Sequence, residues 1–544
     1  MSRTIVPTWR PAPEIDRFYR AAGMWHPACV TDDLRRCTDR FGDKTAVRDS
    51  TTQLTFGQLW DRAAALAGWL RERGLRRGDA VAVQLPSWTE AIVAFHGVLM
   101  AGGVVVPMTS ILRQREVGFI VRQTGARFAV VAEDFRGYSY RDLYADLIGE
   151  GIALDHVLWV RGGAGGERFE EALRTEPVDV ETALASAGRD GDVALVIYTS
   201  GTTADPKGAI HTHEGIAASG DICQRAFGLN ENDVLFNPSP VSHITGISLS
   251  VLFPVAFGCS VTLQEAWDPQ QAFDVIERDR TTFFIFATPF LAALTEIAED
   301  RGVRLDHVRT IVCGGADVPE ALARRAHGRL GTVVRMYGAT ECPNASCGSP
   351  WDSELQRWGT EGHWLFPTEG RVVDPGTGRD LPSGSIGEAW WRGPQLCSGY
   401  VDAERNGAFT ADGWFRTGDL VRLDAGGSLT VQGRIKDIIN RGGEKFSARE
   451  IEDLIAEVPG VADVAVTPVP DPVLGERVCA WVVLEPSADL DLTALTTHLR
   501  GLGLTTQKLP ERLEVIDEMP RTPSGKIRKT DLRDRLEAAP TTRP

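Results

Sequence analysis

The sequence predicts an α/β protein with more than one domain. Segments with the patterns of strands and helices alternate along the first part of the chain, and this alternation is typical of parallel sheets covered by helices on both faces. Gly-rich turns follow several predicted strands, and open α/β sheets bind ligands at that edge. With 544 residues the chain is too long for a single core, so we expect two or three domains.

The first predicted unit of this pattern begins with a helix after Thr55 that ends at Gly74. Thr is a common N-cap residue, and apolar residues follow at helical spacing. The alternation continues with a strand over 80–85, a helix over 88–100, a strand over 104–106, a helix over 116–124 and strands that begin at Phe128, Val193, Phe283, Thr310 and Thr332.

The sequence changes in character after about Leu381. Trp and Phe residues then lie among Gly-containing turns, and the segment 428–434 has the pattern of a strand after a Gly-Gly turn. These features predict a smaller antiparallel or barrel-like part. A separate α+β module is expected from Lys436, in which Ser447 and Glu450 have the spacing of a capping box at the start of a helix.

Composition excludes several classes of protein. The net charge of -16 argues against nucleic-acid binding, which favours a basic face. The N-terminal residues lack the apolar core of a signal peptide, and the apolar stretches 91–107 and 283–294 are interrupted or short, so no membrane span is expected. Nine cysteines without a CxxC pair favour a reduced, cytoplasmic protein without a cysteine metal site.

The segment YTSGTTADPKGAIHTH, residues 198–213, has the composition of a phosphate-binding loop. Small hydroxyl residues and glycines let backbone N–H groups approach an anion closely, and Lys207 adds a positive charge. A flexible surface loop is the alternative. The segment differs from a Walker A loop because Lys207 is followed by Gly208 in place of Ser or Thr.

Four further segments carry candidate functional residues. Residues 337–341 end a predicted strand, where Glu341 could bind Mg²⁺. Residues 414–420 place Asp419 at a turn, where a carboxylate could hold ribose hydroxyls. The remaining two are the basic loop 433–445 and the segment 520–529, which contains Lys526. Taken singly, each could be a solvated turn or loop.

Together and in this order, the five segments resemble the acyl-adenylate-forming (ANL) superfamily of acyl-CoA synthetases, adenylation domains and firefly luciferase. The resemblance covers residues 41–532 and is strongest to CoA ligases for aliphatic, alicyclic or aromatic acids, including cyclohexanecarboxylate-type ligases. Residues 439–452 also resemble aryl-acid activating enzymes of siderophore pathways. Ala204-Asp205 departs from the family pattern, and it should slightly stiffen the loop without removing activity.

The resemblance implies a large N-terminal adenylation domain, residues 1–435, with two parallel-rich sheets and a small barrel-like subdomain. It also implies a mobile C-terminal domain, residues 436–544, that carries the catalytic lysine. Lys436 matches the hinge position, and Gly442, Gly443 and Lys445 would border the path of CoA. The residues implied for ATP are Thr199, Ser200, Gly201, Thr202, Thr203, Lys207, Gly315, Ala316, Tyr337, Asp419, Val431 and Arg434.

The implied catalytic residues are Lys526, Thr340, Glu341 and His243. Lys526 would bridge the α-phosphate and the attacking carboxylate, Thr340 would contact the α-phosphate, and Glu341 would bind the metal, Mg²⁺. His243 matches a position beside the acid. The neighbouring pair His211 and His213 is expected to be structural, because no third metal ligand is apparent.

The implied reaction joins a carboxylic acid to CoA through an acyl-AMP intermediate. Val241, Ile244 and Gly314 would line the acid pocket, and their small or apolar side chains favour a bulky apolar acid, whether alicyclic, aromatic, medium-chain or terpenoid. A separate carrier protein is an alternative acceptor. A non-catalytic acyl-nucleotide sensor and a P-loop ATPase are further alternatives. The oligomeric state stays open, with a homodimer as one option.

Overall fold

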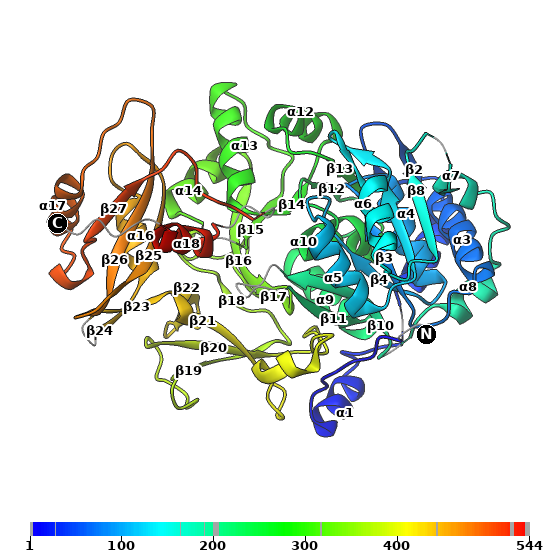
Figure 1. The fold of residues 1–544 in the computed structure, drawn as a ribbon, viewed down its shortest axis with the longest axis horizontal. Coiled ribbons are helices and arrows are strands. Elements are labelled where there is room, and N and C mark those ends of the chain that lie inside the picture. Colours follow the sequence, from blue (N-terminus) through cyan, green and yellow to red (C-terminus); the bar gives the residue numbers. More distant parts are fainter. Residues whose placement is uncertain are drawn as a thin grey trace. The chain divides into compact units, whose positions relative to one another are not determined.

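The computed structural model describes residues 4–27, 29–163, 165–189, 191–199, 206–315, 318–441, 444–522 and 527–538. The chain forms two compact units (Figure 1). Unit 1 comprises Met1–Glu369 and Trp391–Phe415, and unit 2 comprises Gly370–Trp390 and Arg416–Pro544. The functional division expected between residues 435 and 436 stays a prediction.

Unit 1 contains a seven-stranded sheet whose strands are parallel except for the hairpin of β10 and β11 at one edge. Helices α3, α4, α5 and α6 lie around its strands (Figure 1). The strand order is β11 (Lys207–Thr212), β10 (Val193–Thr199), β4 (Val104–Pro107), β3 (Ala80–Gln84), β5 (Phe128–Ala132), β8 (His156–Val160) and β9 (Glu167–Arg168).

The second sheet of unit 1 has nine strands, of which the central six are parallel and the outer pairings are antiparallel. The order is β18 (His363–Trp364), β17 (Cys342–Cys347), β16 (Thr332–Ala339), β15 (Thr310–Gly314), β14 (Phe283–Phe286), β12 (Val234–Asn237), β13 (Ser260–Leu263), β1 (Thr45–Arg48) and β2 (Gln53–Thr55). A short hairpin is formed by β6 (Asp134–Phe135) and β7 (Tyr138–Ser139).

The first long helix, α3, begins as the sequence predicts. The Thr55 hydroxyl accepts from the Gln58 N–H, and the Gln58 side chain accepts from the Thr55 N–H, which completes a capping box. The helices of unit 1 are α1 (Pro13–Ala21), α2 (Val30–Phe41), α3 (Phe56–Glu72), α4 (Thr89–Met100), α5 (Gln114–Thr124), α6 (Tyr140–Gly149), α7 (Phe169–Ala172), α8 (Val180–Ser186), α9 (His213–Phe227), α10 (Ile244–Ile247), the π-helix η1 (Ser248–Leu252), α11 (Phe253–Phe257), α12 (Pro269–Asp279), α13 (Thr288–Asp300), α14 (Glu320–Arg329), α15 (Glu354–Gly359) and the 3₁₀-helix η2 (Ala403–Ala408).

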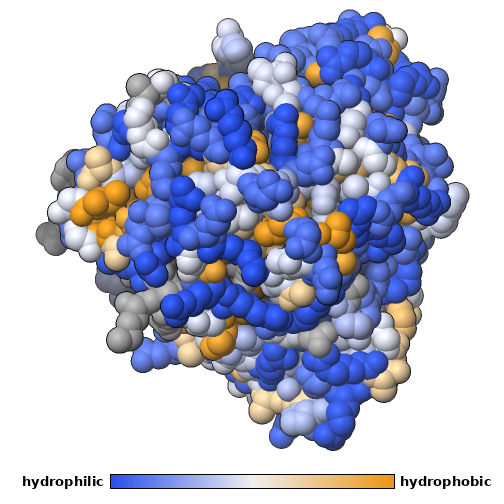
Figure 2. Space-filling view, turned by 90° about the vertical axis from the view of Figure 1, so that its right-hand side faces the viewer, coloured by the Kyte–Doolittle hydropathy of each residue, from blue (hydrophilic) through white to orange (hydrophobic). Residues whose placement is uncertain are grey.

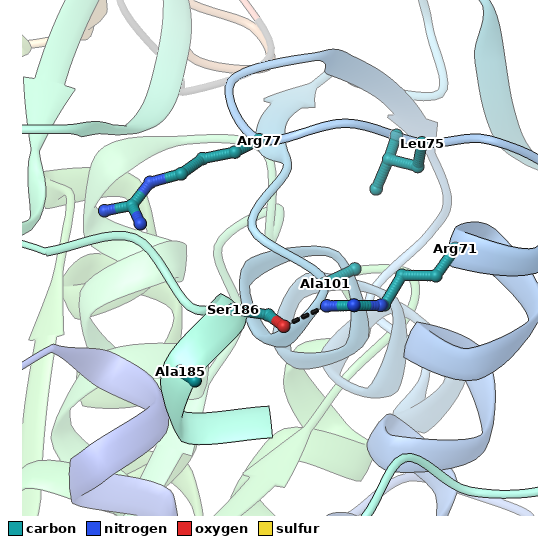
Figure 3. Close-up of a pocket in the computed structure, with 6 residues that line it drawn as sticks. All are labelled: Arg71, Leu75, Arg77, Ala101, Ala185 and Ser186. Atoms are coloured by element: carbon teal, nitrogen blue, oxygen red, sulfur yellow. Dashed lines mark hydrogen bonds between the residues drawn. The ribbon is translucent and has the colours of Figure 1, made fainter. Parts of the chain in front are cut away.

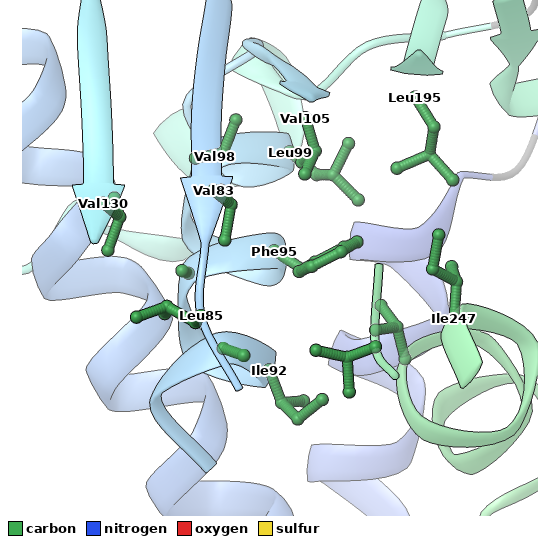
Figure 4. Close-up of a cluster of buried hydrophobic side chains, with 14 of the residues drawn as sticks. Val83, Leu85, Ile92, Phe95, Val98, Leu99, Val105, Val130, Leu195 and Ile247 are labelled. Atoms are coloured by element: carbon green, nitrogen blue, oxygen red, sulfur yellow. The ribbon is translucent and has the colours of Figure 1, made fainter. Parts of the chain in front are cut away.

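Helix α4 lies at the centre of the largest hydrophobic cluster (Figure 4). All but one of its residues are buried, because the helix packs against β3 and β4 as well as against α2, α3, α8 and η1. Such burial on every side gives an apolar run without a polar face. Within the described residues, no helix is long and apolar enough to cross a membrane. Figure 2 shows one face of the molecule, and hydrophilic residues cover most of it.

Unit 2 contains two further sheets. The four-stranded sheet has the order β19 (Glu369–Val373), β20 (Ile386–Arg392), β21 (Phe415–Leu423) and β22 (Leu429–Arg434), and β21 and β22 form an antiparallel hairpin. The five-stranded sheet contains β24 (Glu444–Ser447), β23 (Ile438–Arg441), β26 (Gly475–Leu484), β25 (Val461–Asp471) and β27 (Arg512–Val515). Its helices are η3 (Ile435–Asp437), α16 (Ala448–Ile455), α17 (Leu492–Gly501), η4 (Thr506–Lys508) and α18 (Lys529–Ala538).

The predicted α/β fold class, with a large parallel-rich part and a smaller α+β part, is confirmed. The predicted capping box of α16 is wrong. Ser447 does cap the helix, since its hydroxyl accepts from the Arg449 N–H at 3.2 Å, but Glu450 does not bond back to it. The Glu450 carboxylate instead accepts from Lys508 Nζ at 2.5 Å, because a charged partner competes successfully with a backbone N–H.

Candidate active site

The predicted phosphate-binding segment joins β10 to β11 as a hairpin. Thr199, the last residue of β10, pairs with Lys207, the first residue of β11. Ser200, Gly201, Thr202 and Thr203 lie outside the described residues. The glycine after Lys207 has a structural cause, because a Cβ at Gly208 would come within 2.8 Å of the Tyr198 ring. The Lys-Gly ending that excludes a Walker A loop therefore reflects packing across this hairpin.

Thr340 and Glu341 form the tight turn between β16 and β17. The hairpin leaves no room for a side chain at Gly338, where a Cβ would clash with the Pro343 carbonyl. The Cys397 N–H donates to the Glu341 carbonyl at 2.8 Å, which ties the turn to a later segment. Both side chains are half-buried, as an active-site position at the end of a strand requires.

Tyr400 connects the predicted phosphate-binding lysine with the predicted metal-binding carboxylate. Its hydroxyl donates to Glu341 Oε1 at 2.5 Å, and the Lys207 ammonium lies 5.3 Å from the centre of its ring. These three residues come from β11, from the β16–β17 turn and from the segment 397–401. A cation and a carboxylate that were predicted separately thus lie beside one aromatic side chain.

The segment 397–401 is held beside β11 by backbone hydrogen bonds. Ile210 N–H donates to the Gly399 carbonyl at 2.9 Å, Ser398 N–H to the Ile210 carbonyl at 2.7 Å, and Val401 N–H to the Gly208 carbonyl at 2.9 Å. This pairing places Tyr400 at the start of β11, next to Lys207. Sequence reasoning missed Tyr400, whose only signal was a Gly-Tyr pair after a Pro- and Gly-containing turn.

Gly314 is the last residue of strand β15, and Gly315, expected in the adenine slot, follows it directly. Neighbouring β16 supplies Tyr337, which is buried against Trp391 with ring centres 5.0 Å apart. Ala316 lies outside the described residues. The glycine pair and Tyr337 therefore lie at the same end of two adjacent parallel strands.

His243 is the N-cap of α10, and its Nδ1 lies 3.4 Å from the Thr245 N–H that it accepts from. Helix α10 runs directly into the π-helix η1, a rare conformation that is often found at functional sites. Val241 and Ile244, the predicted acid-pocket residues of this segment, are 2% and 8% exposed. The histidine is thus fixed on an otherwise apolar segment.

His211 and His213 are buried in β11 and at the start of α9. Burial lowers the pKa of each ring to about 4, so both are neutral near pH 7. Within the described ranges, no group of three or more His, Cys, Asp or Glu side chains could hold a metal ion. Glu341 remains a suitable single ligand, because Mg²⁺ is usually bound by one or two carboxylates together with substrate phosphates.

Asp419 and Arg434 form an ion pair between β21 and β22 in unit 2. Arg434 Nε donates to Asp419 Oδ1 at 2.5 Å, and the carboxylate is largely buried. Val431 lies on the same hairpin, paired with Val421. The residues predicted for ribose and adenine contacts in this part of the chain are therefore neighbours on one hairpin.

The candidate hinge, CoA-path and catalytic residues of unit 2 lie only partly within the described residues. Lys436 lies in the short helix η3, whose Asp437 accepts from Arg533 at 2.7 Å. Lys445 pairs with Asn440 across the β23–β24 hairpin. Gly442, Gly443 and the catalytic candidate Lys526 lie outside the described residues, although Arg521 and Ile527, on either side of Lys526, form a β-bridge.

A pocket of about 310 Å³ in unit 1 contains none of the predicted site residues (Figure 3). Its walls combine the exposed side chains of Arg71 and Arg77 with small and apolar groups. Arg71 donates to the Ser186 hydroxyl, and Arg77 pairs with Asp192. This pocket therefore carries no part of the candidate active site.

Comparisons with known proteins cover almost the whole chain. Residues 34–401 match the family profile described as AMP-binding enzyme, and residues 450–526 match the profile described as AMP-binding enzyme C-terminal domain. The medium-chain fatty-acid–CoA ligase of Escherichia coli K12 is 33% identical over 95% of this chain and 92% of its own length.

Two further proteins are similar to this chain over almost its whole length. A salicylyl-CoA synthase / salicylate adenylyltransferase of a Streptomyces species is 33% identical over 95% of each chain. The crystal structure of ATP-bound MatB from Rhodopseudomonas palustris superposes with a TM-score of 0.84 at 27% identity, covering 94% of this chain and 99% of that one. The chain is therefore a member of the AMP-binding enzyme family, the adenylate-forming superfamily that its five motifs predict.

Proposed function

We propose that the protein is an ATP-dependent ligase that joins a carboxylic acid to CoA. In the first half-reaction a carboxylate oxygen attacks the α-phosphorus of ATP, and pyrophosphate leaves with the electrons of the broken P–O bond. In the second, the thiol of CoA attacks the acyl carbon, AMP leaves, and the thiol proton passes to solvent. The products are an acyl-CoA thioester, AMP and pyrophosphate.

The observation that carries this proposal is that Lys207 and Glu341 both lie beside Tyr400, one over its ring and the other at its hydroxyl. Attack by a carboxylate on a polyphosphate needs positive charge and oxygen ligands for a cation close together. Lys207 and the hairpin residues Thr199, Ser200, Gly201, Thr202 and Thr203 would hold the β- and γ-phosphates. Thr340 would contact the α-phosphate, and Glu341 would hold Mg²⁺, which supplies charge neutralisation when bound.

The other residues keep the roles that the motifs imply. Gly315, Ala316, Tyr337 and Val431 would bind the adenine, Asp419 the ribose hydroxyls and Arg434 the ribose or a phosphate. Lys526 would bring its ammonium to the attacking carboxylate and the α-phosphate. Lys436 would be the hinge for the second half-reaction, in which Gly442, Gly443 and Lys445 border the path of CoA.

The acid is proposed to be bulky and apolar. Val241 and Ile244 supply buried apolar surface beside His243, and Gly314, where a Cβ would come within 2.4 Å of the Met336 carbonyl oxygen, adds no side chain to the proposed pocket. Two relatives are named for a medium-chain fatty acid and for salicylate, which fits an acid of this size range. His243 would contact the carboxylate end of the acid.

A separate carrier protein is the second candidate acceptor. The relative named salicylyl-CoA synthase / salicylate adenylyltransferase combines a CoA thioester and an adenylate in one name. The adenylation step is common to both candidates, and only the thiol differs. A non-catalytic acyl-nucleotide sensor would bind ATP and acid without forming either product.

The test is a panel of carboxylic acids with ATP, Mg²⁺ and CoA, read by mass spectrometry for AMP and acyl-CoA. The panel includes fatty acids, cyclohexanecarboxylate, benzoates and fused-ring acids, and Lys526→Ala is the control variant. Acyl-CoA that depends on the acid and falls at least a hundredfold in the variant supports the proposal. Acyl-AMP without acyl-CoA moves the acceptor to a carrier protein, and nucleotide binding without any turnover favours the sensor.

A further inference from the structure

Tyr400 is held rigidly in the candidate active site. The side chain is 2% exposed, and its ring packs edge-on against Phe409 with centres 5.5 Å apart. Its backbone N–H donates to Asn406 Oδ1 at 2.9 Å, and its carbonyl accepts from the Thr8 hydroxyl at 2.6 Å. A tyrosine fixed at both backbone groups and on its ring can determine where its neighbours lie.

Two neighbours of Tyr400 carry opposite charges. The phenol hydroxyl bonds Oε1 of Glu341, and the Lys207 ammonium lies over the ring. In the described part of the chain, no ion pair joins Lys207 to Glu341, and no group other than Tyr400 donates to the Glu341 carboxylate. Both groups lie beside the same side chain, and opposite charges that meet in a partly buried site attract each other strongly.

We infer that Tyr400 is a positioning residue that keeps Lys207 and Glu341 apart and orients Glu341 for a divalent cation. The hydrogen bond fixes Oε1, so Glu341 would offer its other oxygen to a metal ion, while the ring attracts the ammonium by a cation–π interaction. A direct Lys207–Glu341 pair would neutralise both groups before a nucleotide arrives. The inference rests on the proposed function, because it assigns Lys207 to phosphate and Glu341 to Mg²⁺.

The test measures binding rather than turnover. The affinity for α,β-methylene ATP is measured by calorimetry with and without Mg²⁺. This analogue cannot transfer its adenylyl group to an acid. The gain in affinity that Mg²⁺ produces is the readout. Tyr400→Phe removes the hydroxyl and keeps the ring. Tyr144→Phe is the matched control, since it removes another buried phenol hydroxyl, one that joins helix α6 to strand β3 at 3.1 Å from Gln84 Oε1.

We expect Tyr400→Phe to reduce the Mg²⁺-dependent gain about 10- to 100-fold, the range typical when a group that orients a metal ligand is removed. Binding without Mg²⁺ should stay within about threefold of the unchanged protein, because the phenyl ring of the variant still attracts the Lys207 ammonium. Tyr400→Leu, which also removes the ring, should weaken binding without Mg²⁺ as well. Tyr144→Phe should change neither value.

Glu341→Gln closes a double-mutant cycle. It keeps an oxygen that can accept from Tyr400 but removes the charge, so Tyr400→Phe should cause no further loss of the Mg²⁺ effect in its presence. The inference is overturned if Tyr400→Phe keeps the full Mg²⁺ effect, or if the unchanged protein shows none. Failure of the proposed function is a separate result, since the analogue can bind with a Mg²⁺-dependent gain even if no acid is activated.

Discussion

Arg434 Nε donates to Asp419 Oδ1 at 2.5 Å, and this pair joins the middle of β21 to the last residue of β22. The side chain of Asp419 is 13% exposed, whereas the side chain of Arg434 is 49% exposed. The pair therefore combines a largely buried carboxylate with a guanidinium that solvent reaches.

Asp419→Ala should raise the KM for ATP by about tenfold or more, because it removes the proposed acceptor for the ribose hydroxyls and leaves Arg434 without this partner. Steady-state kinetics with ATP varied at saturating acid measure the effect. Asp424→Ala is the control for local stability, because Asp424 lies in the turn of the same hairpin and its carboxylate accepts from the Ser428 N–H. An equal rise in KM for both variants would contradict the ribose role.

Lys207→Met should weaken ATP binding by about 10- to 100-fold while leaving the protein folded, because Met keeps the length of the side chain and removes its charge. The same substitution at Lys508, whose ammonium pairs with Glu450 on the surface of unit 2, is the matched control. Nucleotide affinity measured by calorimetry should fall only for Lys207. Unchanged affinity in Lys207→Met would remove this residue from the phosphate site.

His243→Ala should raise the KM for the acid more than the KM for ATP. The imidazole caps α10 and is proposed to touch the carboxylate end of the acid. His243→Asn can still accept from a backbone N–H, so it should keep the cap and lose the contact with the acid. If both variants alter only thermal stability, the histidine has a structural role.

Lys436→Pro should affect the two half-reactions unequally, by at least about tenfold. Proline fits the backbone of a 3₁₀-helix such as η3 but restricts any later change of φ. Acyl-AMP formation and acyl-CoA formation are measured separately by rapid quench. Equal changes in both rates would contradict the hinge role of this position.

Stability should fall in acid because three histidines are buried in neutral form. Burial lowers the pKa of His96, His211 and His213 from 6.5 to about 4. The unfolded chain therefore binds more protons below pH 6.5, and the stability that each neutral ring contributes above that pH is lost as the pH falls toward 4. Each should contribute a loss of about 2 kcal/mol between pH 7 and pH 5.

His96 provides the cleanest check, since neither ring nitrogen has a hydrogen-bond partner within the described structure. His96→Leu should reduce the loss in the free energy of unfolding between pH 7 and pH 5 by about 2 kcal/mol, the contribution of one buried histidine. It should not destabilise the protein at pH 5. Urea denaturation at several pH values measures this difference. An unchanged slope between pH 7 and pH 5 would show that His96 does not titrate on unfolding.

Local signals made much of the fold predictable. Thr55 and Gln58 stand three positions apart, and the capping box they form needs only neighbouring residues. The same reasoning failed at Ser447, where a lysine 58 positions from Glu450 supplied a stronger partner. Patterns of local spacing carry no information on such distant competitors.

The candidate site was predictable where a motif keeps its residues together. Thr199 and Lys207 lie in one segment and pair across one hairpin. Tyr400 was not predictable in this way, because it meets Glu341 at a separation of 59 positions and Thr8 at a separation of 392. Only the pairing of the segment 397–401 with β11 brings these residues together.

The most direct test of the central claim is acid-dependent exchange of labelled pyrophosphate into ATP, measured without CoA. A ligase that passes through acyl-AMP returns pyrophosphate to ATP only when its acid is present, so we predict exchange with at least one bulky apolar acid and at least a hundredfold less in Lys526→Ala. Exchange that needs no acid would contradict the account. So would the absence of exchange with an acid that the protein converts to acyl-CoA when CoA is added.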